Sequence, residues 1–365
     1  MKKITFCFIV IFIILLGTSG FASDELLFSE DSFRSLAPGY YVSLNRILNN
    51  GDIVCCAESD RGKPVRVILA DPYTGRVKKQ VEIPAKTFDY VASDDLGKYS
   101  ILYSRYDGAF YLVNFTEGKS GTIFKQEKGK PAFALFGALR SGLSFTGEKA
   151  LAWGYFTNEK GVFDGEFMVE INPDAQGISA FNRLFKYNKL RQLAELYYPQ
   201  SKRISAIEFC PDYFVFCAMK NKDGAIIAYK FMDGEHYRID KFLNLTGLSL
   251  SQNGNLLAYI TEKDKQGTLY LYNLKNKDKI KLTEGKLLNP VFSPDETRLG
   301  VGRYEFIKGK GVQFELLIIN LADKSYPVST ISVDSDRLFQ DWKFVKNNKE
   351  LVLFTGRELY HTQLK

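Results

Sequence analysis

The sequence predicts an all-β fold, a β-propeller of seven four-stranded blades closed by an N-terminal strand. The clearest evidence is Leu245–Leu321, where one pattern is written twice in succession. Each copy runs short strand, turn, apolar strand, polar loop, aromatic strand, polar turn, short strand. A four-stranded unit of this length cannot bury both of its faces alone, so it must stack against copies of itself. Six or eight blades are the alternative counts.

Seven turn signals, each placed before an apolar second strand, give the blade count. They are Asn50-Gly51, Asp94-Asp95-Leu96-Gly97, Thr146-Gly147, Pro211-Asp212, Asn253-Gly254, Pro294-Asp295 and Asn347-Asn348. Gly, Pro, Asn and Asp are the residues that a chain reversal favours. An apolar strand and then a second, often aromatic strand follow each signal, and seven such units fit the fold's usual range of about 4–8 blades.

The first residues predict a secretory signal peptide over residues 1–22. Two lysines precede the apolar run Ile4–Leu16, and small residues follow at Gly20 and Ala22. An uncleaved anchor is the alternative. We expect cleavage to leave residues 23–365 as a single propeller domain without a transmembrane segment, in the periplasm or secreted.

Two irregularities interrupt the repeats. Apolar residues recur at helical spacing between the third and fourth units, which predicts a short helical insertion near residues 188–198. The last unit stops after its third strand. Glu25–Ser29 precedes the first complete unit, so we expect it to supply the missing strand beside Glu358–Gln363 and to remove an exposed edge.

Cysteine and charge usage narrow the function classes. Cys55, Cys56, Cys210 and Cys217 remain after cleavage, and we interpret them as small buried residues, with a Cys210–Cys217 bridge as the alternative. Their spacing resembles no zinc site. The formal net charge is +7, but the basic residues are scattered among acids, whereas a nucleic-acid binder concentrates them in a patch. We therefore expect a monomer that binds no nucleic acid.

The blocks VFSPDETRLGV and GTLYLYNLKN resemble the PD40 repeat of TolB-like propellers, which are related to WD40 repeats. The resemblance covers Phe209–Leu321 best and is weaker elsewhere. It implies a propeller fold and an envelope location. TolB-type propellers have six blades and an additional N-terminal α/β domain, and this chain departs from them in both respects.

Signatures of catalysis are missing from the sequence. It has no G-x-S-x-G elbow, Walker loop, GxGxxG turn or EF-hand loop, and only two histidines, His236 and His361. We therefore expect no catalytic residue, metal or cofactor. The acid pairs Asp94-Asp95 and Asp334/Asp336 are candidates for acid–base work or cation binding, but their turn positions favour a structural role.

Loop lengths indicate where a partner would bind. In a propeller, the loops between second and third strands and the connections between blades share one face, here called the loop face. The other two kinds of turn share the opposite, turn face. Two loops of the loop face are long and rich in aromatic and basic residues, as interface hot spots are. The candidate partner-binding residues are Phe156, Phe163, Tyr304, Phe306, Lys308 and Lys310.

These observations predict an exported, non-enzymatic propeller that binds another envelope or extracellular protein. The alternative is a propeller hydrolase or lyase that acts on a sugar or lactone through channel-facing carboxylates. The side chains that line the central channel distinguish the two classes, because an enzyme needs converging acids with perturbed pKa values.

Overall fold

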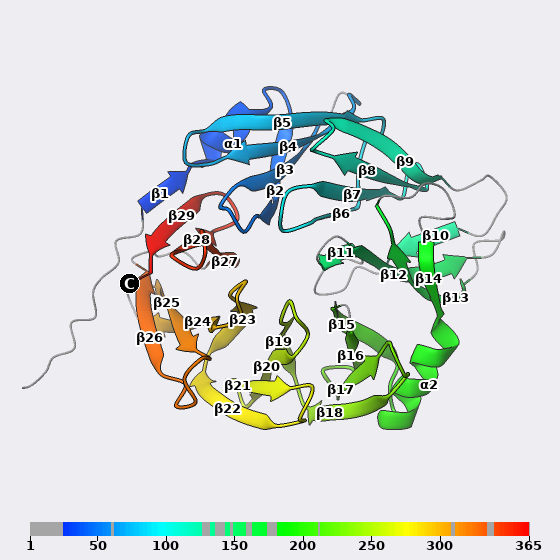
Figure 1. Ribbon diagram of the computed structural model, residues 1–365, viewed down its shortest axis with the longest axis vertical. Coiled ribbons are helices and arrows are strands. Elements are labelled where there is room, and N and C mark those ends of the chain that lie inside the picture. The colour runs from blue at the N-terminus through cyan, green and yellow to red at the C-terminus, as the bar shows by residue number, and fades with distance from the viewer. Residues whose placement is uncertain are drawn as a thin grey trace, which may run out of the picture.

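The described strands pair into seven antiparallel sheets around a central opening (Figure 1). The computed structural model describes residues 25–59, 62–125, 132–135, 143–146, 149–157, 163–173, 181–210, 212–307, 311–333 and 339–364. The predicted signal peptide, residues 1–22, lies outside these ranges. The predicted all-β propeller fold is confirmed.

Five sheets have four strands each in chain order, with the first strand nearest the centre of the ring (Figure 1). They are β2 (Tyr41–Ile47), β3 (Ile53–Glu58), β4 (Val65–Asp71) and β5 (Arg76–Ile83); β6 (Tyr90–Ser93), β7 (Tyr99–Ser104), β8 (Ala109–Asn114) and β9 (Lys119–Lys125); β15 (Arg203–Phe209), β16 (Tyr213–Lys220), β17 (Asp223–Lys230) and β18 (His236–Phe242); β19 (Leu245–Leu250), β20 (Leu256–Lys263), β21 (Gln266–Asn273) and β22 (Lys279–Gly285); and β23 (Leu287–Phe292), β24 (Arg298–Ile307), β25 (Gly311–Asn320) and β26 (Val328–Val333).

One sheet differs from the predicted four-stranded unit because it has five strands. Two short strands, β10 (Ala132–Leu135) and β11 (Leu143–Thr146), both pair with β12 (Lys149–Thr157). The outer strands are β13 (Phe163–Ile171) and β14 (Phe181–Lys186). The first strand of this unit is therefore divided in two, while the rest of the sheet keeps the common order.

The remaining sheet joins the two ends of the chain. Its order is β1 (Glu25–Phe28), β29 (Leu359–Gln363), β28 (Glu350–Phe354) and β27 (Asp341–Val345). Glu25 pairs with His361, and Leu26 pairs with Tyr360. The N-terminal closing strand is thus confirmed.

Two helices accompany the sheets. Helix α1 (Glu30–Leu36) follows β1, and the Ser29 hydroxyl caps it by accepting a hydrogen bond from the backbone N–H of Ser32 at 3.1 Å. Helix α2 (Tyr187–Tyr197) lies over the segment for which the apolar spacing predicts a helix.

The turn between first and second strands repeats one hydrogen bond in several sheets. Ser251 and Ser293 each accept, on the side-chain oxygen, the N–H of the residue five positions later, at 3.1 and 2.9 Å. Asp94 occupies the equivalent position and accepts the N–H of Tyr99 at 3.2 Å. At Gly254 the backbone has φ +69°, and an added Cβ would lie 2.0 Å from Cys210 Sγ, so this turn requires glycine. These local bonds explain the PD40-like turn pattern.

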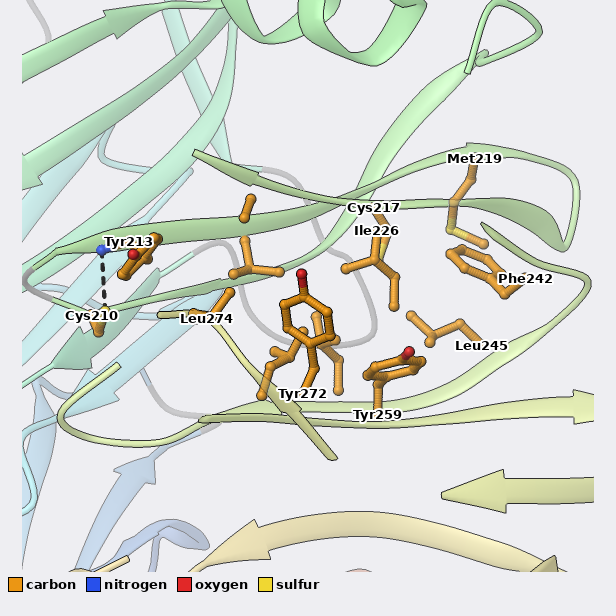
Figure 2. Packing of buried hydrophobic residues seen from close by; sticks show 14 residues of the cluster. Cys210, Tyr213, Cys217, Met219, Ile226, Phe242, Leu245, Tyr259, Tyr272 and Leu274 are labelled. Carbon is orange, nitrogen blue, oxygen red and sulfur yellow. Dashed lines mark hydrogen bonds between the residues drawn. The ribbon is translucent and has the colours of Figure 1, made fainter. Parts of the chain in front are cut away.

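The hydrophobic core lies between neighbouring sheets. The described residues form seven buried clusters, one at each junction of the ring. Figure 2 shows the cluster between the β15–β18 and β19–β22 sheets, where Met219 and Cys217 pack with Leu245 and Tyr259. Because each sheet buries both faces against its neighbours, the ring must close for every face to be covered.

The cysteines have the structural role that their apolar surroundings predict. All four are buried free thiols, so the Cys210–Cys217 bridge is not formed. Burial raises the pKa of the Cys217 thiol well above its usual range. Among the described residues, no helix is long and apolar enough to span a membrane.

Candidate functional site

A cavity of about 600 Å³ occupies the central channel. Residues from the first strand of every sheet, or from the turn that follows it, line this cavity. Most of them come from the ends of these strands nearest the turn face. The volume falls within the roughly 300–1,000 Å³ of small-molecule sites.

Uncharged polar residues are the most numerous polar residues of the described lining. The five amides and four hydroxyls are Asn45, Asn49, Gln252, Asn289, Gln340, Ser93, Ser249, Ser251 and Ser293. Apolar surface comes from side chains that include Phe209 and Phe292. The charged lining residues are Arg46, Lys343, Asp95, Glu208 and Asp341, two cations against three carboxylates.

Asp95 ties three neighbouring sheets together on the channel wall. It lies in the turn after β6 and accepts on Oδ1 from Arg46 of β2, with Nε at 2.9 Å and the nearer terminal nitrogen at 2.7 Å. Lys343 of β27 donates to the same oxygen. The cluster Arg46–Asp95–Lys343 therefore lies where the last sheet meets the first two.

The electrostatics of this cluster follow from burial and from the shared oxygen. Burial raises the pKa of Asp95, but the charges and hydrogen bonds of Arg46 and Lys343 outweigh it and lower the pKa to about 2. Burial and then the Arg46 charge lower the pKa of Lys343 to about 8, although Asp95 acts in the opposite direction. Asp95 is thus held ionised.

The neighbouring Asp94 has the structural role predicted for it. Its side chain is buried and accepts the backbone N–H groups of Lys98 and Tyr99, at 2.8 and 3.2 Å, within the turn. Burial raises the pKa of Asp94. Asp334 and Asp336 lie outside the described residues. Sequence reasoning assigned Asp94 and Asp95 one shared role, and the structure separates them.

The first strands are irregular where they face the channel. The register shifts between Leu44 and Arg46 in β2, and between Leu288 and Val291 in β23. Within the second irregularity, Asn289 has φ +50°, and its amide donates a long hydrogen bond of 3.4 Å to Asp341 of β27. Such bulges re-aim side chains and occur preferentially at functional sites.

Two of the partner-binding residues predicted from the sequence, Tyr304 and Phe306, lie away from this cavity. The register of β23 with β24 places Tyr304 and Phe306 beyond Leu287, at the end of the sheet opposite Ser293. Tyr304 is half-buried and packs edge-to-face on Phe306, with ring centroids 5.7 Å apart. Phe306 itself is exposed, with the Lys286 ammonium 5.3 Å from its ring centroid.

The other predicted residues are placed only in part. Phe156 lies near the end of β12 and Phe163 at the start of β13, on the loop face, and their backbones pair with Gly165 and Thr157. Lys308 and Lys310 lie outside the described residues. The predicted partner-binding set therefore stays a prediction.

The structure adds exposed side chains on the loop face that loop lengths did not indicate. Tyr41 pairs with Glu58 at the end of β3, Tyr106 lies in the β7–β8 loop, and Leu243 connects β18 to β19. With Phe306, these four side chains have exposed fractions of 62% to 79%. The large exposed apolar residues in the described turns of the turn face are Leu96 and Met232.

The two histidines lie in outer parts of the sheets. The Tyr197 hydroxyl is 2.8 Å from Nδ1 of His236, and His361 faces Glu25 at 3.2 Å. Within the ranges that the structure covers, no group of three or more His, Cys, Asp or Glu side chains is placed to hold a metal ion.

The sequence matches no protein-family model and no curated protein. Solved structures are similar over most of the chain. An oligogalacturonate lyase in complex with manganese has a TM-score of 0.58 and 10% identity, covering 94% of this chain and 96% of that one. The β-propeller domain of Myceliophteria thermophila Cps50 (Swd1) has a TM-score of 0.54 and 12% identity, covering 93% and 100%. TolB from Acinetobacter baumannii has a TM-score of 0.43 and 14% identity, covering 81% and 63%. The first two likenesses show the fold alone: the chain is a β-propeller.

Proposed function

We propose that this chain is an exported, non-enzymatic β-propeller that binds another protein of the cell envelope or the extracellular space through its loop face. The observation that carries the proposal is the set of four exposed apolar side chains, Tyr41, Tyr106, Leu243 and Phe306, on that face. They come from different parts of the ring, so a partner would contact several blades. Aromatic side chains are enriched at protein interfaces and at hot spots.

The sequence pattern of residues 1–22 supports export, and the PD40-like turns support an envelope protein. Phe306 is also held in place by its contacts with Tyr304 and Lys286. An aromatic side chain that is ordered before binding loses little conformational entropy when a partner covers it.

The chemistry of Asp95 does not favour catalysis by this channel-facing carboxylate. Asp95 has a pKa of about 2 because Arg46 and Lys343 share its oxygen. A general acid or base works best with a pKa near the operating pH. Asp95 therefore serves better as the counter-ion of two cations than as the acid–base residue of a sugar hydrolase or lyase.

Replacing the four exposed loop-face residues Tyr41, Tyr106, Leu243 and Phe306 with Ser tests this proposal. Each buried hot-spot contact contributes about 1–2 kcal/mol, so the variant should retain a partner from envelope extract at least about tenfold less than the native chain. The measurement is the amount of one partner band that the immobilised chain retains from the extract. Folding should be unaffected because these side chains are exposed.

The matched control replaces Leu96 and Met232, the exposed residues of the turn face, with Ser. It should retain the partner as the native chain does. If all three proteins retain the partner equally, the loop face is not the binding surface. The same conclusion follows if the control variant and the test variant both lose the partner.

A further inference from the structure

We propose that the channel cavity is a second binding site, for an uncharged, hydroxyl-rich ligand such as a short neutral oligosaccharide. The inference is independent of the protein-binding proposal, because most of the cavity lining lies toward the turn face and the four exposed apolar residues lie on the loop face. The site rests on the lining chemistry, on the irregular backbone of β23 and on the charge balance.

The lining presents groups that both donate and accept hydrogen bonds. Gln252 is exposed and Ser249 is half-buried, and neither side chain takes part in a hydrogen bond among the described residues. A sugar hydroxyl also donates and accepts, so amides and hydroxyls suit it better than a row of like charges does. Phe209 and Phe292, both half-buried, add apolar residues to the same lining.

Asn289 and Asp341 form a hydrogen-bonded pair in the lining. Asn289 adopts φ +50° inside an irregular stretch of β23, a conformation that side-chain-bearing residues seldom adopt. Its amide reaches the Asp341 carboxylate of the neighbouring sheet at 3.4 Å, and Asp341 remains exposed to the cavity. An amide beside a carboxylate offers a donor and two acceptors, which suits two adjacent hydroxyls of one sugar ring.

The charge balance decides against an anionic ligand. The described residues of the lining include two cations, Arg46 and Lys343, and three carboxylates, Asp95, Glu208 and Asp341, so their formal charge is negative. The two cations are already bound to Asp95. Among the described lining residues both cations are paired with Asp95, so an acidic oligosaccharide would meet the exposed Asp341 carboxylate, and like charges brought together repel.

Binding to an array of neutral and acidic oligosaccharides tests the site, followed by titration calorimetry with the tightest neutral one. Asp341→Asn should weaken binding about tenfold or more, because a hydrogen bond to a charged group is lost. Asn289→Gly should weaken it similarly, since Gly is compatible with the positive φ and removes the side chain that carries the amide. Gln252→Ala is the third channel variant. Gln252 is exposed, so this substitution changes no packed side chain.

Lys324→Ala, in an exposed turn away from the channel, should bind as the native chain does. Thermal unfolding of each variant separates lost binding from lost folding. The proposal is overturned if the array retains no neutral oligosaccharide, if acidic ones bind more tightly, or if the three channel variants bind the neutral ligand like Lys324→Ala. The channel then serves the structure of the ring alone.

Discussion

Deletion of residues 24–30 is expected to lower the free energy of unfolding by about 5 kcal/mol or more. The deletion removes β1, whose backbone pairs with β29. It also removes Phe28, which is 3% exposed and packs edge-to-face on Phe33 with ring centroids 4.9 Å apart. Loss of a buried Phe costs about 3–5 kcal/mol, and loss of the Ser29 cap about 1 kcal/mol more.

Chemical and thermal denaturation of the native chain and the deletion variant measure this effect. Domains are typically stable by about 5–15 kcal/mol, so the loss should be a large fraction of the total and should lower the midpoint by roughly 10 °C or more. Leu26→Ser is the matched control, because Leu26 is half exposed and its substitution leaves the backbone pairing intact. An unchanged midpoint after the deletion would show that β1 does not hold the ring closed.

The fold was predictable because its signals are local. Each turn is encoded within about six residues, as in Ser293, whose hydroxyl accepts the N–H of Arg298. The closing strand was predictable because the last unit lacks a strand and Glu25–Ser29 is left over. Helix α1 was not predicted. It spans only Glu30–Leu36, too few residues for an apolar periodicity to show.

The candidate channel site was not predictable, because it depends on contacts between distant parts of the chain. Asp94 and Asp95 are neighbours in one turn, but Asp94 bonds within that turn, and Asp95 bonds to Arg46 and Lys343. Alignment of this turn with those of Ser251 and Ser293 identifies Asp94 as the turn acceptor, but nothing in the local sequence identifies the partners of Asp95. Similarly, the Asn289–Asp341 pair joins two sheets, and the positive φ of Asn289 follows from a bulge that the apolar pattern does not show.

Asp95→Asn is expected to destabilise the protein by about 2 kcal/mol at pH 7, with an effect that disappears in acid. The substitution leaves Arg46 and Lys343 close together without their carboxylate. Breaking a fully buried ion pair costs about 3–5 kcal/mol. The Asp95 side chain keeps 30% exposure, so solvent screens part of that cost.

The sign of the pH dependence follows from the lowered pKa. The folded-state pKa of Asp95 is about 2, below the usual value of 3.8 for an aspartate side chain. Stability from this carboxylate is therefore fully present above pH 4 and is lost as the pH falls toward 2. The difference in unfolding free energy between the native chain and Asp95→Asn should shrink over that window. Other carboxylates titrate alike in both proteins, so their contributions cancel in this difference.

Urea unfolding at several pH values between 2 and 7 measures this difference. Asp323→Asn is the matched control, because Asp323 lies in an exposed turn and the Asn side chain can still accept the hydrogen bonds that Asp323 receives from Ser325. Its stability should stay within about 0.5 kcal/mol of the native value. The prediction fails if the native chain and Asp95→Asn have the same unfolding free energy at pH 7, or if their difference stays constant down to pH 2. Asp95 would then not link the last sheet to the first two.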